Sequence, residues 1–111
     1  MDIDIIIPIY NAFDFVRKCI ETVIEHTDLT QHTLLLVNDK STDERILPLL
    51  NSFIKENQSL NIILINNKDN QGFVRTVNIG MQYSHHDVVL LNSDTEVTRN
   101  WLSKTQNCAY S

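Results

Sequence analysis

The sequence has 111 residues, of which 42% are hydrophobic, and a formal net charge of −5 at pH 7. This length suits a single domain with one modest core, because a chain near this size buries roughly two thirds of its accessible surface on folding. An acidic chain lacks the basic surface that sequence-independent binding to nucleic acid requires, so that class of function is excluded.

Cysteine usage and the first residues bear on the cellular compartment. Cys19 and Cys108 stand far apart without metal-ligand spacing, so we expect two free thiols, one of them in the core, rather than a disulfide framework or a zinc site. The apolar run within MDIDIIIPIY is too short for a membrane span or a signal-peptide core, and acids stand where a basic flank belongs. We therefore expect a cytoplasmic protein without a transmembrane segment, which in its intact form could lie against the inner face of a membrane.

Four apolar runs rich in β-branched residues recur along the chain and predict strands. They are continuous rather than alternating, which is typical of strands that are covered on both faces of a sheet. The predicted strands span residues 4–10, 33–38, 61–66 and 87–92.

A helix is predicted after the first strand. Residues at helical spacing share one face there, namely Val16, Cys19, Ile20, Val23, Ile24 and Thr27. Asn11 stands before them, and an Asn side chain can cap the free backbone N–H groups at a helix start.

A second helix is predicted after the second strand. It opens with the residues STDE at positions 41–44, a pattern that matches a capping box in which Ser41 and Glu44 satisfy each other's backbone donors. Pro48 interrupts the helical spacing that follows, so this helix is either kinked or begins its regular part near Leu47.

The third predicted helix begins at Asn70 and turns Phe73, Val77 and Met81 inward, with Gly80 permitting close packing. Strands that alternate with helices of this length imply right-handed parallel crossovers. The sequence therefore predicts an α/β fold with three layers, α/β/α, around a mainly parallel sheet.

Polar residues follow each predicted strand. In an open parallel sheet, ligands bind beyond the carboxyl ends of the strands, so these residues are expected to converge at one edge. In chain order they are Pro8 to Asn11, Asn38 to Ser41, Asn66 and Asn67 with Asn70 to Gly72, and Asn92 to Asp94.

The segments IIIPIYNA, VNDKSTD, NQGFVRTVNIG and LLNSD occur in this order on the four predicted strand ends. Together they resemble the nucleotide-sugar glycosyltransferases of family 2, which have the Rossmann-like GT-A fold, over residues 3 to about 102. The resemblance implies that residues 1–111 form the N-terminal, nucleotide-sugar-binding part of an apparently truncated GT-A domain. It also implies an inverting transfer from a UDP-, dTDP- or GDP-sugar to a saccharide or lipid-linked acceptor, usually in polysaccharide or glycolipid synthesis.

The resemblance places the nucleobase against Asp39. Uracil, thymine and guanine each present an N–H donor on the pairing edge, and a fixed carboxylate is a good acceptor for it. Tyr10 would stack on or flank the ring, and Pro8 would fix the backbone as it leaves the sheet.

The resemblance places a divalent ion, Mg²⁺ or Mn²⁺, on Asp94. Such an ion neutralises the departing diphosphate as a Lewis acid. Relatives commonly end this strand in Asp-X-Asp, but here the first position is Asn92, which can hydrogen-bond a ribose hydroxyl without adding charge. A lone carboxylate holds such ions loosely until phosphates complete the shell, so little metal binding is expected without nucleotide. Leu90 and Leu91, just before this motif, are expected to be deeply buried.

Four further residues complete the predicted nucleotide site. Arg75 would reach the diphosphate from the third helix, whose N-terminus at Asn70 and Gly72 would face the same crevice. Asn11 belongs to the polar set after the first strand.

Each of the two acids also has a simpler interpretation, since both Asp39 and Asp94 could be ordinary turn residues.

An inverting transfer needs a general base to deprotonate the acceptor. In relatives this acid is carried by the second half of the domain, so we expect this chain to bind donor nucleotide weakly and to transfer sugar poorly or not at all. Trp101 is expected to pack under the end of the sheet. If a missing half covers the sheet, apolar surface around Val97 to Leu102 should be exposed and could drive self-association.

Two alternatives come from other functional classes. A receiver-like signalling domain is also a small α/β sheet with strand-end acids, but it requires an acidic pair after the first strand and a phosphoacceptor Asp after the third, where this chain has Pro8 to Tyr10 and Asn66 to Asn67. The second alternative is a nucleotide-binding or assembly module that catalyses no reaction of its own.

Overall fold

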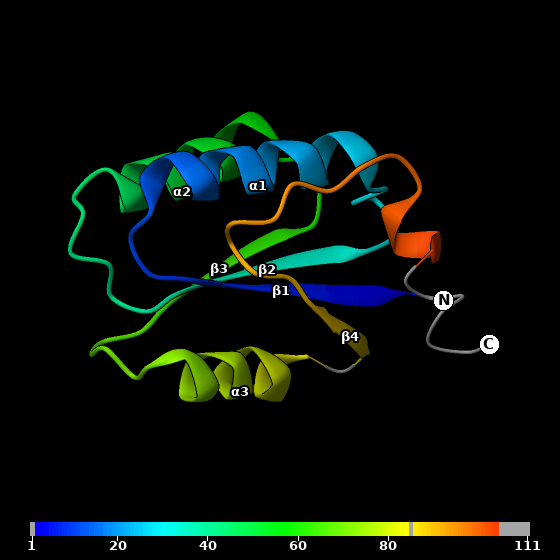
Figure 1. Cartoon of the computed structure of the whole chain (residues 1–111). Coiled ribbons are helices and arrows are strands. Elements are labelled where there is room, and N and C mark those ends of the chain that lie inside the picture. The colour runs from blue at the N-terminus through cyan, green and yellow to red at the C-terminus, as the bar shows by residue number, and fades with distance from the viewer. Residues whose placement is uncertain (1, 85, 105–111) are drawn as a thin grey trace.

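The structure is a computed structural model that describes residues 2–84 and 86–104. Strands and helices alternate from β1 to β4 (Figure 1). Their bounds are β1 Ile3–Ile9, α1 Phe13–His26, β2 Thr33–Asn38, α2 Ile46–Glu56, β3 Ile62–Asn66, α3 Phe73–Tyr83 and β4 Asp87–Leu90. All four predicted strands are confirmed, although the fourth ends at Leu90 rather than at residue 92.

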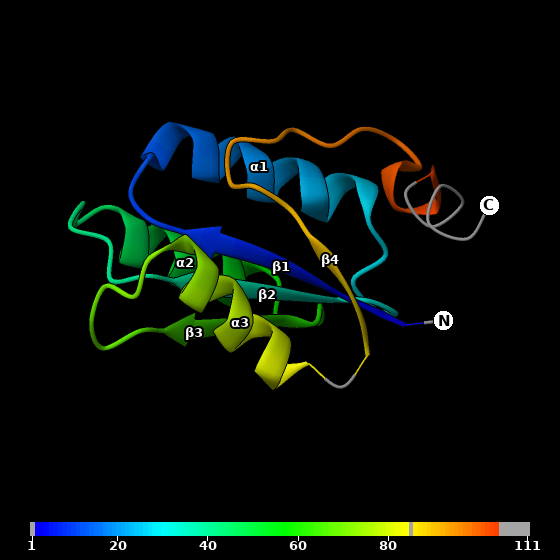
Figure 2. The ribbon, with the colours of Figure 1, turned by 60° about the horizontal axis from the view of Figure 1, so that its bottom comes forward.

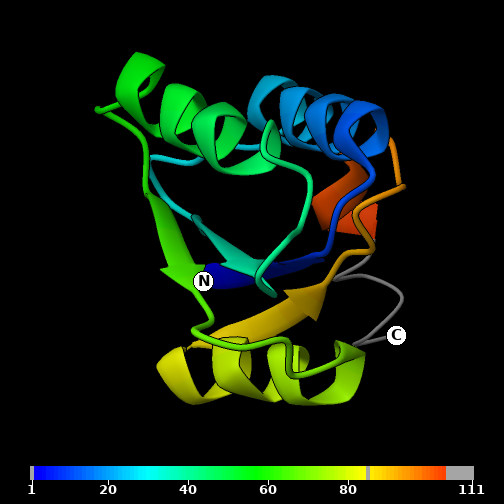
Figure 3. The ribbon, with the colours of Figure 1, turned by 90° about the vertical axis from the view of Figure 1, so that its left-hand side faces the viewer.

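The four strands form one parallel sheet in the order β3-β2-β1-β4. Helices α1 and α2 cover one face, and α3 covers the other (Figures 1 and 3). Figure 2 shows α3 in front of the sheet as it carries the chain from β3 back past β1 to β4. The predicted three-layer α/β/α architecture is therefore confirmed, and the carboxyl ends of the strands meet at the edge onto which Figure 3 looks.

The core is divided between the two faces of the sheet. In β1, Ile5 and Ile7 point toward α1 and α2, whereas Ile6 points toward α3. The larger cluster lies under α1 and α2 and includes the buried thiol of Cys19, which is free as predicted. Cys108 lies outside the described residues. Burying an isoleucine side chain is worth roughly 2 kcal/mol, so the inner strands β1 and β2 dominate the stability of the sheet.

Helix α3 packs closely on the sheet through Gly80. A Cβ atom at this position would lie 2.9 Å from Cγ2 of Ile6 and 3.3 Å from Cγ2 of Val37, so the predicted close packing is confirmed. The inward face is Thr76 and Gly80, and the prediction that Phe73 and Met81 face inward is wrong, since they are 56% and 49% exposed. The small residues face the sheet because only they allow this separation.

The predicted caps of α1 and α2 are wrong. The residue before α1 is Ala12, in left-handed conformation with a φ of 58°, and no side chain caps the helix. The Asn11 side chain turns to the loop after β2, where Oδ1 accepts a hydrogen bond from the backbone N–H of Asp43 at 2.9 Å and Nδ2 donates to Oγ1 of Thr42 at 2.9 Å. The Asn11 side chain therefore bonds the loop after β2 and does not cap α1.

Helix α2 begins at Ile46, after Arg45, without a side-chain cap. Ser41, expected in the capping box, instead donates from Oγ to Oδ1 of Asn38 at 2.8 Å and accepts from the backbone N–H of Asn11 at 2.9 Å. Pro48 is the third helical residue, so it lies in the first turn, where a backbone N–H has no intrahelical partner and the ring is tolerated.

The segment after β4 folds back onto α1. Val97, Trp101 and Leu102 are buried in the larger core cluster, and the Trp101 Nε1 donates to Oγ1 of Thr27 at 2.8 Å. The expectation that Val97 to Leu102 expose apolar surface is therefore wrong, because the end of α1 already covers them. Leu91 is buried as predicted, but Leu90 is 45% exposed.

Asp4 is a buried acid near the amino end of β1. It accepts a hydrogen bond from the Ser84 hydroxyl, and its Oδ2 lies 3.4 Å from Nδ1 of His86. These partners follow α3, so Asp4 ties the end of that helix to the sheet.

Within the described part of the chain, no helix combines the length and the apolar character that a membrane crossing requires.

Candidate functional site

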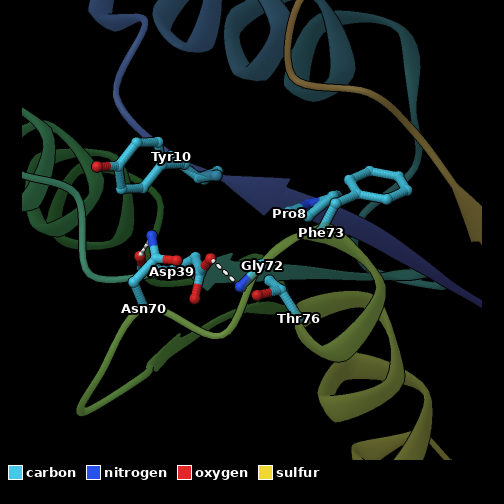
Figure 4. Close-up of a pocket in the computed structure, with 8 residues that line it drawn as sticks. Pro8, Tyr10, Asp39, Asn70, Gly72, Phe73 and Thr76 are labelled. Carbon is cyan, nitrogen blue, oxygen red and sulfur yellow. Dashed lines mark hydrogen bonds between the residues drawn. The ribbon is translucent and has the colours of Figure 1, made fainter.

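A cavity of about 500 Å³ opens at the carboxyl ends of β1 and β2 and is bounded by the start of α3 (Figure 4). We call it the Asp39 cavity. Five residues that the sequence places in the binding site line it. They are Pro8, Tyr10, Asp39, Asn70 and Gly72, and the structure adds Ile9, Phe73 and Thr76.

Both the backbone and the carboxylate of Asp39 are held by neighbouring residues. The backbone N–H of Asp39 donates to the carbonyl of Ile9 at 2.8 Å, which extends the pairing of β2 with β1 by one residue. Its Oδ1 accepts from the backbone N–H of Gln71 at 2.7 Å and from Nδ2 of Asn67 at 2.9 Å, and its Oδ2 accepts from the backbone N–H of Gly72 at 2.9 Å. With 4% of its surface exposed, Asp39 is a preorganised acceptor rather than a loose turn residue.

The charge of Asp39 follows from these contacts. Burial by itself would raise the pKa of the carboxyl group. Hydrogen bonds from the Gln71 backbone, the Asn67 side chain, the Gly72 backbone and the Thr76 hydroxyl outweigh burial and bring the pKa below its usual value. Asp39 is therefore an anion at neutral pH, and it occupies the N-terminal end of α3, where an anion is favoured.

Two aromatic rings flank the mouth of the Asp39 cavity. Figure 4 shows the Tyr10 ring across the cavity from Asp39. Tyr10 is 48% exposed, and Phe73 lines the same cavity from the first residue of α3. Half-exposed rings beside a fixed acceptor suit a flat heterocycle that carries an N–H donor.

A second cavity of about 410 Å³, the Asp94 cavity, adjoins the first. The two cavities share Pro8, Tyr10 and Phe73 as lining residues, so both predicted acids open onto the same edge of the sheet. Asn92, Ser93 and Asp94 line the Asp94 cavity together with Ala12 and Phe15.

The turn that carries Asp94 rests on α1. The Cys19 thiol lies 3.6 Å from the carbonyl oxygen of Asn92, to which it donates, and the backbone N–H of Thr95 closes the turn on the same carbonyl at 3.1 Å. Burial, together with the nearby charge of Asp94, raises the pKa of the Cys19 thiol to about 12, although the Thr95 backbone lowers it. Cys19 therefore remains a thiol that supports the turn.

The donor set around Asp94 is sparse. Among residues 2–84 and 86–104, no group of three or more His, Cys, Asp or Glu side chains could hold a metal ion. Asp94 is exposed and has the neutral oxygens of Asn92 and Ser93 beside it in the cavity. Such a set fits Mg²⁺ or Mn²⁺ only as part of a shell that substrate oxygens and water complete.

Two predicted site residues line neither cavity. Asn11 uses its side chain to hold Thr42 and Asp43, so it shapes the loop after β2. Arg75 lies exposed in the first turn of α3 and is not among the residues that line the two cavities.

Three residues of the site were given no role from the sequence, although Asn67 was placed among the polar residues expected at this edge of the sheet. Asn67 bridges Asp39 and the Thr76 hydroxyl, which it reaches at 3.2 Å, and Phe73 lines both cavities. Thr76 is a polar residue on the buried face of α3, and a rotation of the predicted helix face by one residue would have revealed it.

Comparisons with known proteins bear on the family and the fold of the chain. A sequence model of the family described as "Glycosyl transferase family 2" matches residues 4–109. Over 101 residues, 88% of this chain, the sequence is 32% identical to polypeptide N-acetylgalactosaminyltransferase 11 of Xenopus tropicalis, of which the chain covers 17%.

Two solved structures show the same fold. The crystal structure of S. aureus TarS 1-349 in complex with UDP-GlcNAc matches with a TM-score of 0.78 at 18% identity, over 96% of this chain and 30% of that one. The mannosyltransferase PcManGT from Pyrobaculum calidifontis, in complex with GDP-Man and Mn²⁺, matches with a TM-score of 0.80 at 17% identity, over 91% of this chain and 32% of that one. The chain thus spans less than a third of each of these proteins. Because the family match covers almost the entire sequence, the chain belongs to glycosyl transferase family 2 and has the GT-A fold.

Proposed function

We propose that this chain is the donor-nucleotide half of an inverting glycosyltransferase that uses a UDP-, dTDP- or GDP-sugar. The observation that carries the proposal is the placement of two acids at adjoining cavities on one sheet edge, with Asp39 buried as an anion and Asp94 exposed. The family assignment supports it, and so do the nucleotide sugars bound by TarS and PcManGT. The same assignment argues against the receiver-like alternative.

In this proposal the nucleobase enters the Asp39 cavity. Asp39 accepts the N–H of the pairing edge, Tyr10 flanks the ring, and Pro8, which lines the cavity, fixes the backbone where β1 ends. Asn70 and Gly72 act through the loop that encloses Asp39, since the Asn70 side chain donates to the Asp39 carbonyl at 3.3 Å. This half of the site is built before the ligand arrives.

The ribose and diphosphate then extend toward the Asp94 cavity. Asn92 would hydrogen-bond a ribose hydroxyl, and Asp94 with Ser93 would hold a divalent ion on the diphosphate. Arg75, exposed in the first turn of α3, would reach the phosphates from outside the two cavities. The ion, Mg²⁺ or Mn²⁺, would neutralise charge on the leaving diphosphate. We assign the general base and the acceptor site, for a saccharide or a lipid-linked acceptor, to no described residue. The isolated chain should therefore bind donor weakly and transfer little sugar.

Calorimetric titration with UDP, dTDP and GDP, with and without Mn²⁺, tests the proposal. We expect at least one diphosphate to bind, with an affinity that falls about tenfold or more in Asp39→Ala and that depends on Mn²⁺ only while Asp94 is present. Glu21→Ala is the matched control, because Glu21 is an exposed acid on α1 that lines neither cavity. Failure of every diphosphate to bind, or equal loss in the control, would contradict the proposal.

The same titration separates the alternative of a catalytically silent nucleotide-binding module. Both functions predict binding, but only a transferase half should distinguish UDP with Mn²⁺ from UDP alone, since the metal serves the leaving group. A site that binds nucleotide with no metal dependence would favour the silent module.

A further inference from the structure

The acceptor capacity of Asp39 is nearly used up by its own chain. A carboxylate offers about four acceptor positions, two on each oxygen. Oδ1 already receives two donors, from the Gln71 backbone and the Asn67 side chain, and Oδ2 receives one, from the Gly72 backbone. At most one lone pair, on Oδ2, is left for a ligand, and the Thr76 hydroxyl beside the carboxylate would have to leave it free.

The carboxylate cannot easily turn to offer a second oxygen. Rotation would break its bonds to the N–H groups of Gln71 and Gly72, which precede α3 and need an acceptor. The backbone of Asp39 is held from both sides as well, by the Ile9 carbonyl and by the Asn70 side chain. The cavity therefore presents one fixed acceptor position, not a bidentate pair.

A single acceptor discriminates between nucleobases. Uracil and thymine have one N–H on the pairing edge, set between two carbonyl groups, and this N–H needs one acceptor. Guanine presents two adjacent donors, N1–H and the 2-amino group, which pair best with both oxygens of a carboxylate. Cytosine presents a ring-nitrogen lone pair at the same position, which a carboxylate repels.

Building on the proposed function, we infer that the donor is a diphosphate of uridine or thymidine and not of guanosine or cytidine. The second N–H of the Asn70 side-chain amide, whose residue lines the same cavity, can donate to a carbonyl group that flanks the imide N–H. Tyr10 and Phe73, which both line the cavity, offer apolar ring surface to either pyrimidine. The selection among nucleobases thus depends on the number of free acceptor positions on the Asp39 carboxylate, and not on its charge alone.

Ligand changes test this inference without disturbing the fold. In calorimetric titrations of the chain at one fixed Mn²⁺ concentration, UDP and dTDP should bind about tenfold or more tightly than GDP, CDP and N3-methyl-UDP, which keeps the ring and phosphates of UDP but lacks the N–H. Equal binding of GDP and UDP, or of N3-methyl-UDP and UDP, would overturn the inference and leave the proposed function standing. If no diphosphate binds, the proposed function fails and the inference falls with it.

A pair of matched amide variants adds a second readout. Asp39→Asn replaces the free acceptor with an N–H donor, so the ratio of UDP to CDP affinity should fall about tenfold or more, whereas Asp94→Asn should weaken both ligands equally. Asp4→Asn, which alters a buried acid outside both cavities, controls for loss of stability. An unchanged ratio in a folded Asp39→Asn variant, verified by circular dichroism, would overturn the inference, and the ligand series decides if that variant does not fold.

Discussion

The Asp39 and Asp94 cavities share a wall of three residues, yet they are built in opposite ways. Asp39 is buried and receives three N–H donors from its own chain, while Asp94 is exposed on a turn that the buried Cys19 thiol supports. The first acid is held by the fold, whereas the second has no fixed partners. Under the proposed function, a nucleotide would therefore meet a preformed cavity at Asp39 and an incomplete set of ligands at Asp94.

The two acids are expected to contribute differently to the free energy of folding and to ligand binding. Bonds from buried N–H groups to a carboxylate are worth about 1.5–3 kcal/mol each, so Asp39 contributes to folding and to binding at once. An exposed acid without fixed partners contributes little to stability. Changes at Asp39 should thus alter the protein without ligand, and changes at Asp94 should be visible only with ligand.

The largest expected effect comes from removing the Asp39 carboxylate. Asp39→Ala leaves the N–H groups of Gln71 and Gly72 without their acceptor, and we expect a loss of about 3 kcal/mol in the free energy of unfolding. Asp94→Ala should change it by less than about 0.5 kcal/mol. Urea denaturation measures both variants, and equal losses would contradict the contrast between the cavities.

A smaller effect should follow from Gly80→Ala. The added Cβ would meet the branched side chain of Ile6 at 2.9 Å, so α3 must shift, at a cost of about 2 kcal/mol. Because Gly72 and Thr76 reach Asp39 from the start of α3, the nucleobase affinity should fall as well. Asn78→Ala, at an exposed position of the same helix, is the control. Unchanged stability in Gly80→Ala would show that the helix packs less tightly than the structure indicates.

Acid should remove the contribution of Asp39 selectively. Its pKa is lowered in the folded state, so its stabilisation is present in full above the ordinary Asp pKa of about 3.9 and is lost as the pH falls from there through the folded-state pKa. Between pH 5 and pH 3, wild type should lose more stability than Asp39→Ala does. Denaturation curves at each pH provide the comparison, and parallel pH profiles would refute the lowered pKa.

The smallest effect is expected for metal alone. Since Asp94 is a single exposed carboxylate, 1 mM Mn²⁺ without nucleotide should raise the free energy of unfolding by about 0.4 kcal/mol or less. Mn²⁺ together with UDP should stabilise the chain more than the sum of the two ligands added separately, and Asp94→Ala should remove that excess. Strong stabilisation by Mn²⁺ alone would mean that the Asp94 cavity is already complete.

Much of the fold follows from the sequence because the decisive signals are local. Runs such as residues 4–10 and 33–38 are apolar without alternation, which identifies strands covered on both faces, and parallel strands bring their carboxyl ends to one edge. This topology places Asp39, Asp94 and Tyr10 at that edge, because each of them follows the carboxyl end of a strand.

The errors arose where distant partners decide the local structure. Asn11 bonds the loop after β2 instead of capping α1, and Ser41 bonds Asn38 instead of capping α2, because loops far apart in sequence share these side chains. The inward face of α3 depends on the contact between Gly80 and Ile6. The bonds that hold the Asp39 carboxylate come from residues about thirty positions away, and no local pattern contains them.

A crystal structure of this chain with UDP and Mn²⁺, with an anomalous difference map recorded for manganese, tests the central claim most directly. We expect the uracil N–H on Oδ2 of Asp39, a manganese peak at the Asp94 carboxylate, and one nucleotide that joins the two cavities. A nucleobase bound away from Asp39, or manganese bound away from Asp94, would contradict it.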